Sequence, residues 1–238
     1  MPAPNRREDF DLKLVGLEAE VEGLAYFVGE TIQRSVEALK ARDLVVSRQV
    51  IEDDDYIDRK QAEIEARCIN LIATQQPVAR DLRAIIALLH IGVELERIGD
   101  YAEGIGKISL SIGEEQTLKP LIDIPLMSQK ATDMLTDSID ALLTRDTEKA
   151  QAVRDADDDV DDLYDKVYHD LLEYMINDPE TIQRATYLLW VAHDIERIAD
   201  RATNIAEQVE FLVNGSNLDI AMSPIRQTQR ERVLSASG

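Results

Sequence analysis

Apolar side chains recur along this chain at the three- and four-residue intervals of an α-helix, and almost no stretch alternates as a β-strand does. Prolines, glycines and short polar stretches interrupt the pattern and divide it into segments. The pattern therefore predicts six long helices. Their expected ranges are residues 10–41, 43–74, 78–111, 126–144, 146–176 and 179–213.

The second half of the chain repeats the pattern of the first. The phrase ELERIGDYAEGI begins at Glu94 and its counterpart DIERIADRATNI at Asp194, while ALKARD at Ala38 matches ALLTRD at Ala141. The offset is about 103 residues in the first two elements of each half and about 100 in the third. Such a repeat predicts an all-α fold of two tandem, pseudo-symmetric three-helix bundles.

Helix-breaking residues mark the expected boundaries of these bundles. Gly113, Pro120 and Pro125 interrupt the pattern between the two copies, and Asn214-Gly215 is typical of a helix end. The polar, arginine-containing C-terminus has no periodicity and is expected to be loosely ordered. The expected units are a first bundle at 8–111, a linker at 112–125, a second bundle at 126–214 and a tail at 215–238.

Charge and cysteine content narrow the class of protein. The net charge is −21 and only 5% of the residues are aromatic, so we expect no nucleic-acid binding. The N-terminus has no apolar stretch and no run reaches eighteen apolar residues, which predicts neither signal peptide nor membrane span. The single cysteine, Cys68, is interpreted as inert packing in a reduced compartment. We therefore expect a cytoplasmic protein that reaches a membrane only through partners.

Pairs of acidic residues four positions apart are the candidate chemistry. Each pair stacks two carboxylates on one helix face, where they repel each other. One pair lies on the second helix of each copy and one on the third. Because consecutive helices pack antiparallel, the two pairs of a copy are expected to face each other and to suit a hard cation. The residues are Asp54, Asp58, Glu96 and Asp100 in the first copy, and Asp157, Asp161, Glu196 and Asp200 in the second.

Other interpretations of these residues remain open from the sequence alone. Arg97 and Arg197 each follow a glutamate, so simple ion pairing explains part of the pattern. The DDD runs beginning at Asp53 and at Asp157 offer neighbouring registers on the second helix. A plain helical scaffold whose acidic stripes are surface charge is a further alternative.

Histidines and catalytic motifs add little to the candidate chemistry. His193 shares a face with Glu196, but the first copy has Val93 there, and we interpret His193 as satisfied or exposed rather than as a ligand. His90 and His169 are interpreted as structural. The chain has no Gly-rich phosphate loop, no HExxH and no ferritin-type Glu-x-x-His, which disfavours a metal-dependent enzyme or redox centre. We therefore expect no catalytic residues.

Four phrases resemble one known family. They are ERIGDYAEGI, ERIADRATNI, QPVARDLRAI from Gln76 and RQVIEDDDYID from Arg48, and together with the repeat they resemble the PhoU family over about residues 8 to 215. The resemblance implies two tandem three-helix bundles. It also implies that the acidic residues of both copies bind metal ions, with iron, zinc, magnesium or manganese as the candidates.

The resemblance also implies a regulatory role. Members of the family are negative regulators of the phosphate-starvation response and of phosphate uptake. They are expected to act between the ATPase subunit of a phosphate ABC transporter and a sensor histidine kinase. The same resemblance implies a cytoplasmic homodimer that touches the membrane only through these partners.

Overall fold

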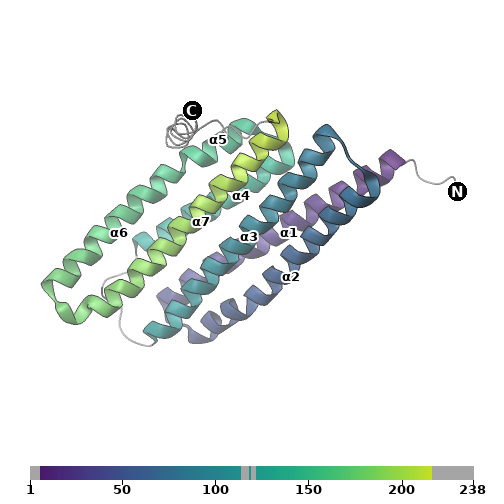
Figure 1. Cartoon of the computed structure of the whole chain (residues 1–238). Helices are drawn as coiled ribbons and strands as arrows, with labels where there is room; N and C mark the ends of the chain where they lie inside the picture. The colour runs from purple at the N-terminus through teal and green to yellow at the C-terminus, as the bar shows by residue number, and fades with distance from the viewer. Residues whose placement is uncertain (1–5, 114–117, 119–121, 216–238) are drawn as a thin grey trace, which may run out of the picture.

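A computed structural model of the chain describes residues 6–113, 118 and 122–215, and all regular secondary structure in this part is helical (Figure 1). The predicted tail beyond Gly215 and half of the predicted linker lie outside these residues. The elements are α1 (Arg6–Ala41), α2 (Leu44–Gln75), α3 (Ala79–Ile112), α4 (Asp123–Thr144), α5 (Thr147–Asp155), α6 (Asp157–Asn177), a short 3-10 helix (Pro179–Thr181) and α7 (Ile182–Asn214). The predicted all-α fold is confirmed.

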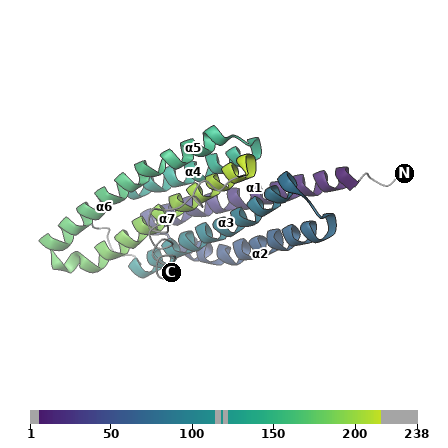
Figure 2. The same cartoon turned by 45° about the horizontal axis from the view of Figure 1, so that its top comes forward.

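Two three-helix bundles lie side by side along an elongated molecule. Helices α1, α2 and α3 form the first bundle, and α4, α7 and the α5–α6 pair form the second (Figures 1 and 2). The third helix of each copy, α3 and α7, lies at the centre, where the two pack against each other. Buried apolar residues of both bundles form one continuous core, so the repeats share their interior.

The predicted fifth helix, 146–176, is wrong in one respect, because it is divided at Ala156 into α5 and α6. Three aspartates in succession, Asp157 to Asp159, form the first turn of α6. Aspartate is a poor residue inside a helix but is favoured at a helix N-terminus, where its charge complements the helix dipole. Helix α6 thus begins at Asp157, one of the candidate ligands, whereas the matching run Asp53 to Asp55 lies inside the unbroken α2.

Other helix boundaries differ from the prediction by a few residues. Helix α1 begins at Arg6 rather than at residue 10, and an ion pair between Arg7 and Asp81 ties its first turn to α3. Helix α4 begins at Asp123, so Pro125 lies in its first turn, where the missing N–H leaves no hydrogen bond unmade. Helix α7 ends as predicted, with Gly215 in a left-handed conformation at φ 78°.

The connection between the first two helices of each copy uses the same cap. The Asp43 carboxylate accepts hydrogen bonds from the N–H groups of Val45 and Val46 at 3.0 and 3.1 Å. Asp146 occupies the matching position, and its carboxylate accepts from the N–H groups of Glu148 and Lys149 at 3.0 and 3.0 Å. These caps satisfy N–H groups that the first turn leaves free and set the register between neighbouring helices. The matched sequences ALKARD and ALLTRD thus encode matched turns.

Glycines at seven-residue intervals allow α2 to approach α3 closely. Gly92, Gly99 and Gly106 lie on the face of α3 that meets α2, and a Cβ atom at Gly99 would lie 2.8 Å from Ile57 Cδ1 and 3.5 Å from Asp54 Oδ1. The matching positions of α7 are buried alanines, Ala192, Ala199 and Ala206. The close approach at Gly99 places the acidic residues of α2 directly beside those of α3.

Replacing Gly99 with alanine is expected to destabilise the protein by about 1–3 kcal/mol relative to Gly23→Ala, because the new Cβ overlaps Ile57 on α2. Gly23 is the matched control, since a Cβ there meets nothing within 4 Å and gains only the helix propensity of alanine. Urea unfolding of the two variants measures the difference. Equal stabilisation by both substitutions would contradict the tight α2–α3 contact.

Candidate metal centres

The first candidate cluster lies between α2 and α3. Asp54 and Glu96 are partly buried, whereas Asp58 and Asp100 are exposed. Oδ1 of Asp54 is buried and has no hydrogen-bond partner among the described residues. A buried carboxylate oxygen without a partner costs free energy unless something positive reaches it.

The pKa values show that the carboxylates of this cluster lie within electrostatic reach of one another. Burial, together with the charges of Glu103, Asp58 and Asp100, raises the pKa of Asp54 to about 6. Burial and the charges of Asp100 and Asp58 raise the pKa of Glu96. Burial and the charges of Asp58 and Glu103 raise the pKa of Asp100. The structure thus brings the two predicted pairs of this copy together.

One acidic residue of this cluster was missed by the sequence reasoning. Glu103 lies on α3, seven residues after Glu96, and its charge raises the pKa values of Asp54 and Asp100. Its side chain is paired with Lys107, whose charge lowers the same two pKa values. The second copy has Thr203 at this position, so the repeat did not reveal Glu103. Its spacing from Glu96 and Asp100 on one helix face was the available signal.

The second cluster lies between α6 and α7. Burial and the charges of Asp161, Asp200 and Glu196 raise the pKa of Asp157 to about 6. Burial and the charges of Glu196 and Asp200 raise the pKa of Asp161. Here too the structure brings the two predicted pairs together.

The structure resolves the register of the aspartate runs. Asp53 turns away from the first cluster and forms an ion pair with Arg34 of α1 at 2.5 Å. In the second copy, Asp159 pairs with Lys130 of α4 at 2.8 Å. Asp54 and Asp157 are therefore the members of each run that face the third helix.

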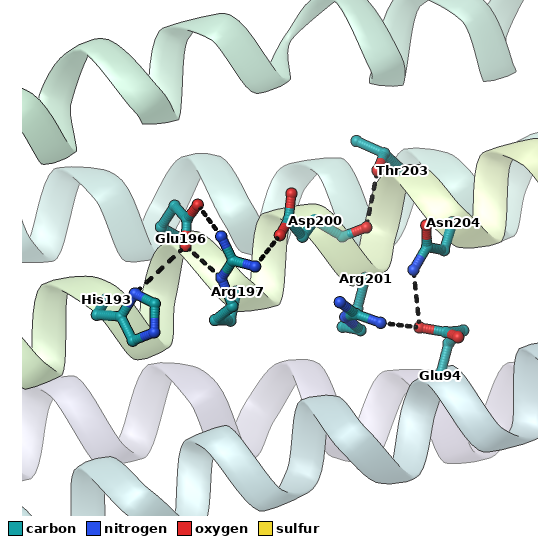
Figure 3. A network of polar contacts seen from close by, with 8 residues as sticks. All are labelled: Glu94, His193, Glu196, Arg197, Asp200, Arg201, Thr203 and Asn204. Carbon is teal, nitrogen blue, oxygen red and sulfur yellow. Dashed lines mark hydrogen bonds and ion pairs between the residues drawn. The ribbon is translucent and has the colours of Figure 1, made fainter. Parts of the chain in front are cut away.

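The second cluster contains an arginine, as Figure 3 shows. The Arg197 guanidinium donates from Nε and Nη2 to the two carboxylate oxygens of Glu196, at 2.6 and 2.5 Å. Its Nη1 lies 2.9 Å from Asp200 Oδ2. The matching residue of the first copy, Arg97, instead pairs with Glu94 at 3.5 Å. Ion pairing therefore accounts for part of the second acidic pattern, whereas in the first copy Arg97 pairs with Glu94 and acts on Glu96 and Asp100 only through its charge, which lowers their pKa values.

The interface between α3 and α7 holds further polar side chains. Glu94 of α3 accepts hydrogen bonds from Arg201 Nη1 at 3.3 Å and from Asn204 Nδ2 at 3.1 Å, both on α7 (Figure 3). Asp194 occupies the matching position on α7, and its Oδ2 lies 3.0 Å from where a Cβ of Gly104 would be. Burial raises the pKa of Asp194 to about 7. The two copies therefore differ at the α3–α7 interface: the charge of Glu94 is stabilised by hydrogen bonds from Arg201 and Asn204, whereas burial disfavours the charge of Asp194.

The three histidines lie on the surface, and the cysteine is buried. His193 is half exposed, and its Nδ1 lies 3.6 Å from Glu196 Oε2. His90 and His169 are exposed. Cys68 is fully buried, and burial raises the pKa of its thiol to about 11, which confirms the interpretation as inert packing.

The candidate ligands of both clusters are all carboxylate oxygen atoms, the ligand type that hard cations prefer. Within residues 6–113, 118 and 122–215, no three carboxylate, imidazole or thiolate groups are already grouped so as to hold one metal ion. The partnerless oxygen of Asp54 and the raised pKa values of Asp54 and Asp157 nevertheless fit a bound positive charge. The donor set is therefore compatible with a hard cation.

The fold and the clusters define a class of all-α proteins in which two repeated three-helix bundles each carry acidic residues between their second and third helices. A family model described as the PhoU domain matches residues 21–109 and 124–209. The chain therefore belongs to the PhoU family.

Individual relatives extend over most of the chain. A "phosphate-specific transport system accessory protein PhoU homolog" of Caulobacter vibrioides is 38% identical, covering 87% of this chain and 90% of the relative. A protein of the same description from Clostridium acetobutylicum is 37% identical, covering 90% and 98%. The crystal structure of PhoU from Pseudomonas aeruginosa matches with a TM-score of 0.83 at 31% identity, covering 87% of this chain and all of that one. The predicted family resemblance is confirmed.

Proposed function

We propose that this protein is a negative regulator of the phosphate-starvation response and of phosphate uptake, acting as a metal-binding helical adaptor. Membership in the PhoU family supports an accessory, regulatory role in phosphate transport, because its relatives are named for that role. The observation that carries the proposal is the carboxylate cluster found at matching places in both bundles.

The proposed ligands are the acidic residues that the repeat singles out, namely Asp54, Asp58, Glu96, Asp100, Asp157, Asp161, Glu196 and Asp200. Iron, manganese and magnesium suit all-carboxylate sites, and zinc also accepts carboxylate ligands. A bound cation would supply positive charge that offsets the repulsion within each cluster. The carboxylates of each cluster repel one another across α2 and α3 and across α6 and α7, so their charge state affects how closely these helices pack.

The proposed partners are the ATPase subunit of a phosphate ABC transporter and a sensor histidine kinase, reached on the cytoplasmic side of the membrane. Among the described helices, none is long and apolar enough to cross a membrane. Helix α6 exposes Tyr168, Leu172 and Ile176 at four-residue intervals, and α7 exposes Trp190. Exposed apolar side chains grouped in this way are typical of a surface that contacts other proteins, which supports an adaptor. Association into a homodimer stays a prediction.

The adaptor role predicts that neutralising the carboxylate clusters abolishes the repression of the phosphate-starvation response when phosphate is plentiful. A variant with Asp54, Asp58, Asp157 and Asp161 all replaced by asparagine is expected to bind the purified ATPase subunit and kinase at least about tenfold more weakly, because cation binding is lost from both bundles. A phosphate-starvation reporter is then expected to be active in phosphate-replete cells. Binding is measured with purified components, with and without chelator.

The matched control is the Asp55→Asn, Asp162→Asn variant, which removes charge from exposed positions of the same two helices. It is expected to bind and repress as the unaltered protein does. Retention of partner binding and repression by the four-asparagine variant, at equal protein level, would overturn the metal-dependent adaptor role.

A further inference from the structure

Arg197 holds the second cluster in a way that Arg97 does not hold the first. Its guanidinium spans Glu196, through two hydrogen bonds, and Asp200, at 2.9 Å, so one cation contacts both candidate ligands on α7. The Glu196 side chain is only 13% exposed, and the hydrogen bond to it raises the pKa of Arg197. Paired, charge-assisted hydrogen bonds of this kind are the strongest that an arginine makes.

The difference between the copies has a visible cause. In the first copy, Glu94 lies within reach of Arg97, which pairs with it at 3.5 Å. The same carboxylate is anchored by Arg201 and Asn204 of α7. In the second copy the matching residue is the shorter Asp194, which faces Gly104 across the interface. Arg197 therefore has Glu196 and Asp200 as its carboxylate partners in the described part of the chain.

We propose that Arg197 is an internal counter-ion of the second cluster, which a metal ion must displace, so that the second cluster binds cations more weakly than the first. The proposal rests on the proposed metal binding of both clusters. The guanidinium contacts both carboxylate oxygens of Glu196 and Oδ2 of Asp200, and its positive charge repels a metal ion at close range. Arg197 is 35% exposed, so its side chain has a path to solvent when it leaves.

The test compares each arginine in a chain where only one cluster remains. The second cluster is measured in a full-length protein carrying Asp54→Asn and Asp58→Asn, and the first in one carrying Asp157→Asn and Asp161→Asn. Titration with Mn²⁺, followed by electron paramagnetic resonance, gives the Kd of each cluster. Arg197→Gln is expected to lower the Kd of the second cluster by about tenfold, since it removes a competing positive charge. Arg97→Gln is expected to change the Kd of the first by less than about threefold.

A second readout reports on Arg197 directly. Titration of the same protein with diamagnetic Mg²⁺ is expected to shift the Nε–Hε signal of Arg197 in NMR spectra, and to leave that of Arg97 unchanged. Arg197→Lys, which keeps the charge without the paired hydrogen bonds, is expected to give a smaller decrease in Kd than Arg197→Gln. Thermal unfolding of each variant verifies that it is folded.

Two outcomes distinguish the counter-ion role of Arg197 from the metal-binding function on which it rests. Mn²⁺ binding at the first cluster, with a Kd of the second cluster that Arg197→Gln leaves unchanged or raises, would overturn the role of Arg197 alone. Failure of Mn²⁺ to bind either cluster in any variant would overturn both the metal-binding function and the role of Arg197.

Discussion

Replacing Asp194 with asparagine is expected to stabilise the protein by roughly 2–4 kcal/mol at pH 8, and by less at pH 5. Asp194 lies at the α3–α7 interface opposite Gly104, and burial raises its pKa to about 7. Among the described residues, no cation forms an ion pair with it. Its charged form is therefore unfavourable in the folded protein, and asparagine removes that charge with little change of shape.

The pH dependence follows from the direction of the pKa shift. The pKa in the unfolded chain is near 3.9, so between about pH 4 and pH 7 the folded protein binds more protons at this position than the unfolded chain. The contribution of Asp194 to the free energy of unfolding therefore decreases as the pH rises through this window and is constant above it. The advantage of asparagine grows over the same window. Urea unfolding of both proteins at several pH values measures it.

Glu94→Gln is the matched control, because Glu94 is the counterpart of Asp194 in the first copy. Unlike Asp194, it has an arginine partner among the described residues. Its carboxylate accepts hydrogen bonds from Arg201 and Asn204, so removing its charge is expected to destabilise the protein by about 1–3 kcal/mol. Effects of equal sign for the two substitutions would contradict the electrostatic asymmetry of the α3–α7 interface.

Replacing Asp54 and Asp58 with asparagine is expected to weaken cation binding at the first cluster by about 100-fold or more, because two of its charged ligands are lost. The same variant is expected to be more stable than the unaltered protein in metal-free buffer. There, the substitutions relieve the repulsion that, after burial, raises the pKa values of Glu96 and Asp100. Mn²⁺ titration and urea unfolding measure the two effects, which have opposite signs.

Asp55→Asn serves as the control for this pair, since it removes a charge from an exposed neighbour on the same helix. It is expected to leave both quantities within experimental error. An asparagine pair that destabilises the metal-free protein while leaving Mn²⁺ affinity intact would show that the first cluster is a structural element and no cation site.

Most of the fold could be predicted because helical periodicity and the repeat are local properties of the chain. The facing of the acidic residues of α2 and α3 also followed, since a short loop makes successive helices antiparallel; in the structure Asp54 lies within electrostatic reach of Asp100, and Asp58 within reach of Glu96. The division at Ala156 was missed, because the apolar pattern continues through it and the matching aspartate run of the first copy, Asp53 to Asp55, lies inside an unbroken helix. The arginines at 97 and 197 have different partners. The sequence shows Glu94 in one copy and Asp194 in the other, but not that Arg201 and Asn204 anchor Glu94 across the α3–α7 interface.

Crystals of the full-length protein grown with Mn²⁺, measured at the manganese absorption edge, test the central claim most directly. Anomalous density is expected between α2 and α3, beside Asp54 and Asp100, and at higher Mn²⁺ concentration between α6 and α7, beside Asp157 and Glu196. Density confined to other surfaces, or absent from both clusters at saturating Mn²⁺, would contradict the assignment of these carboxylates as metal ligands.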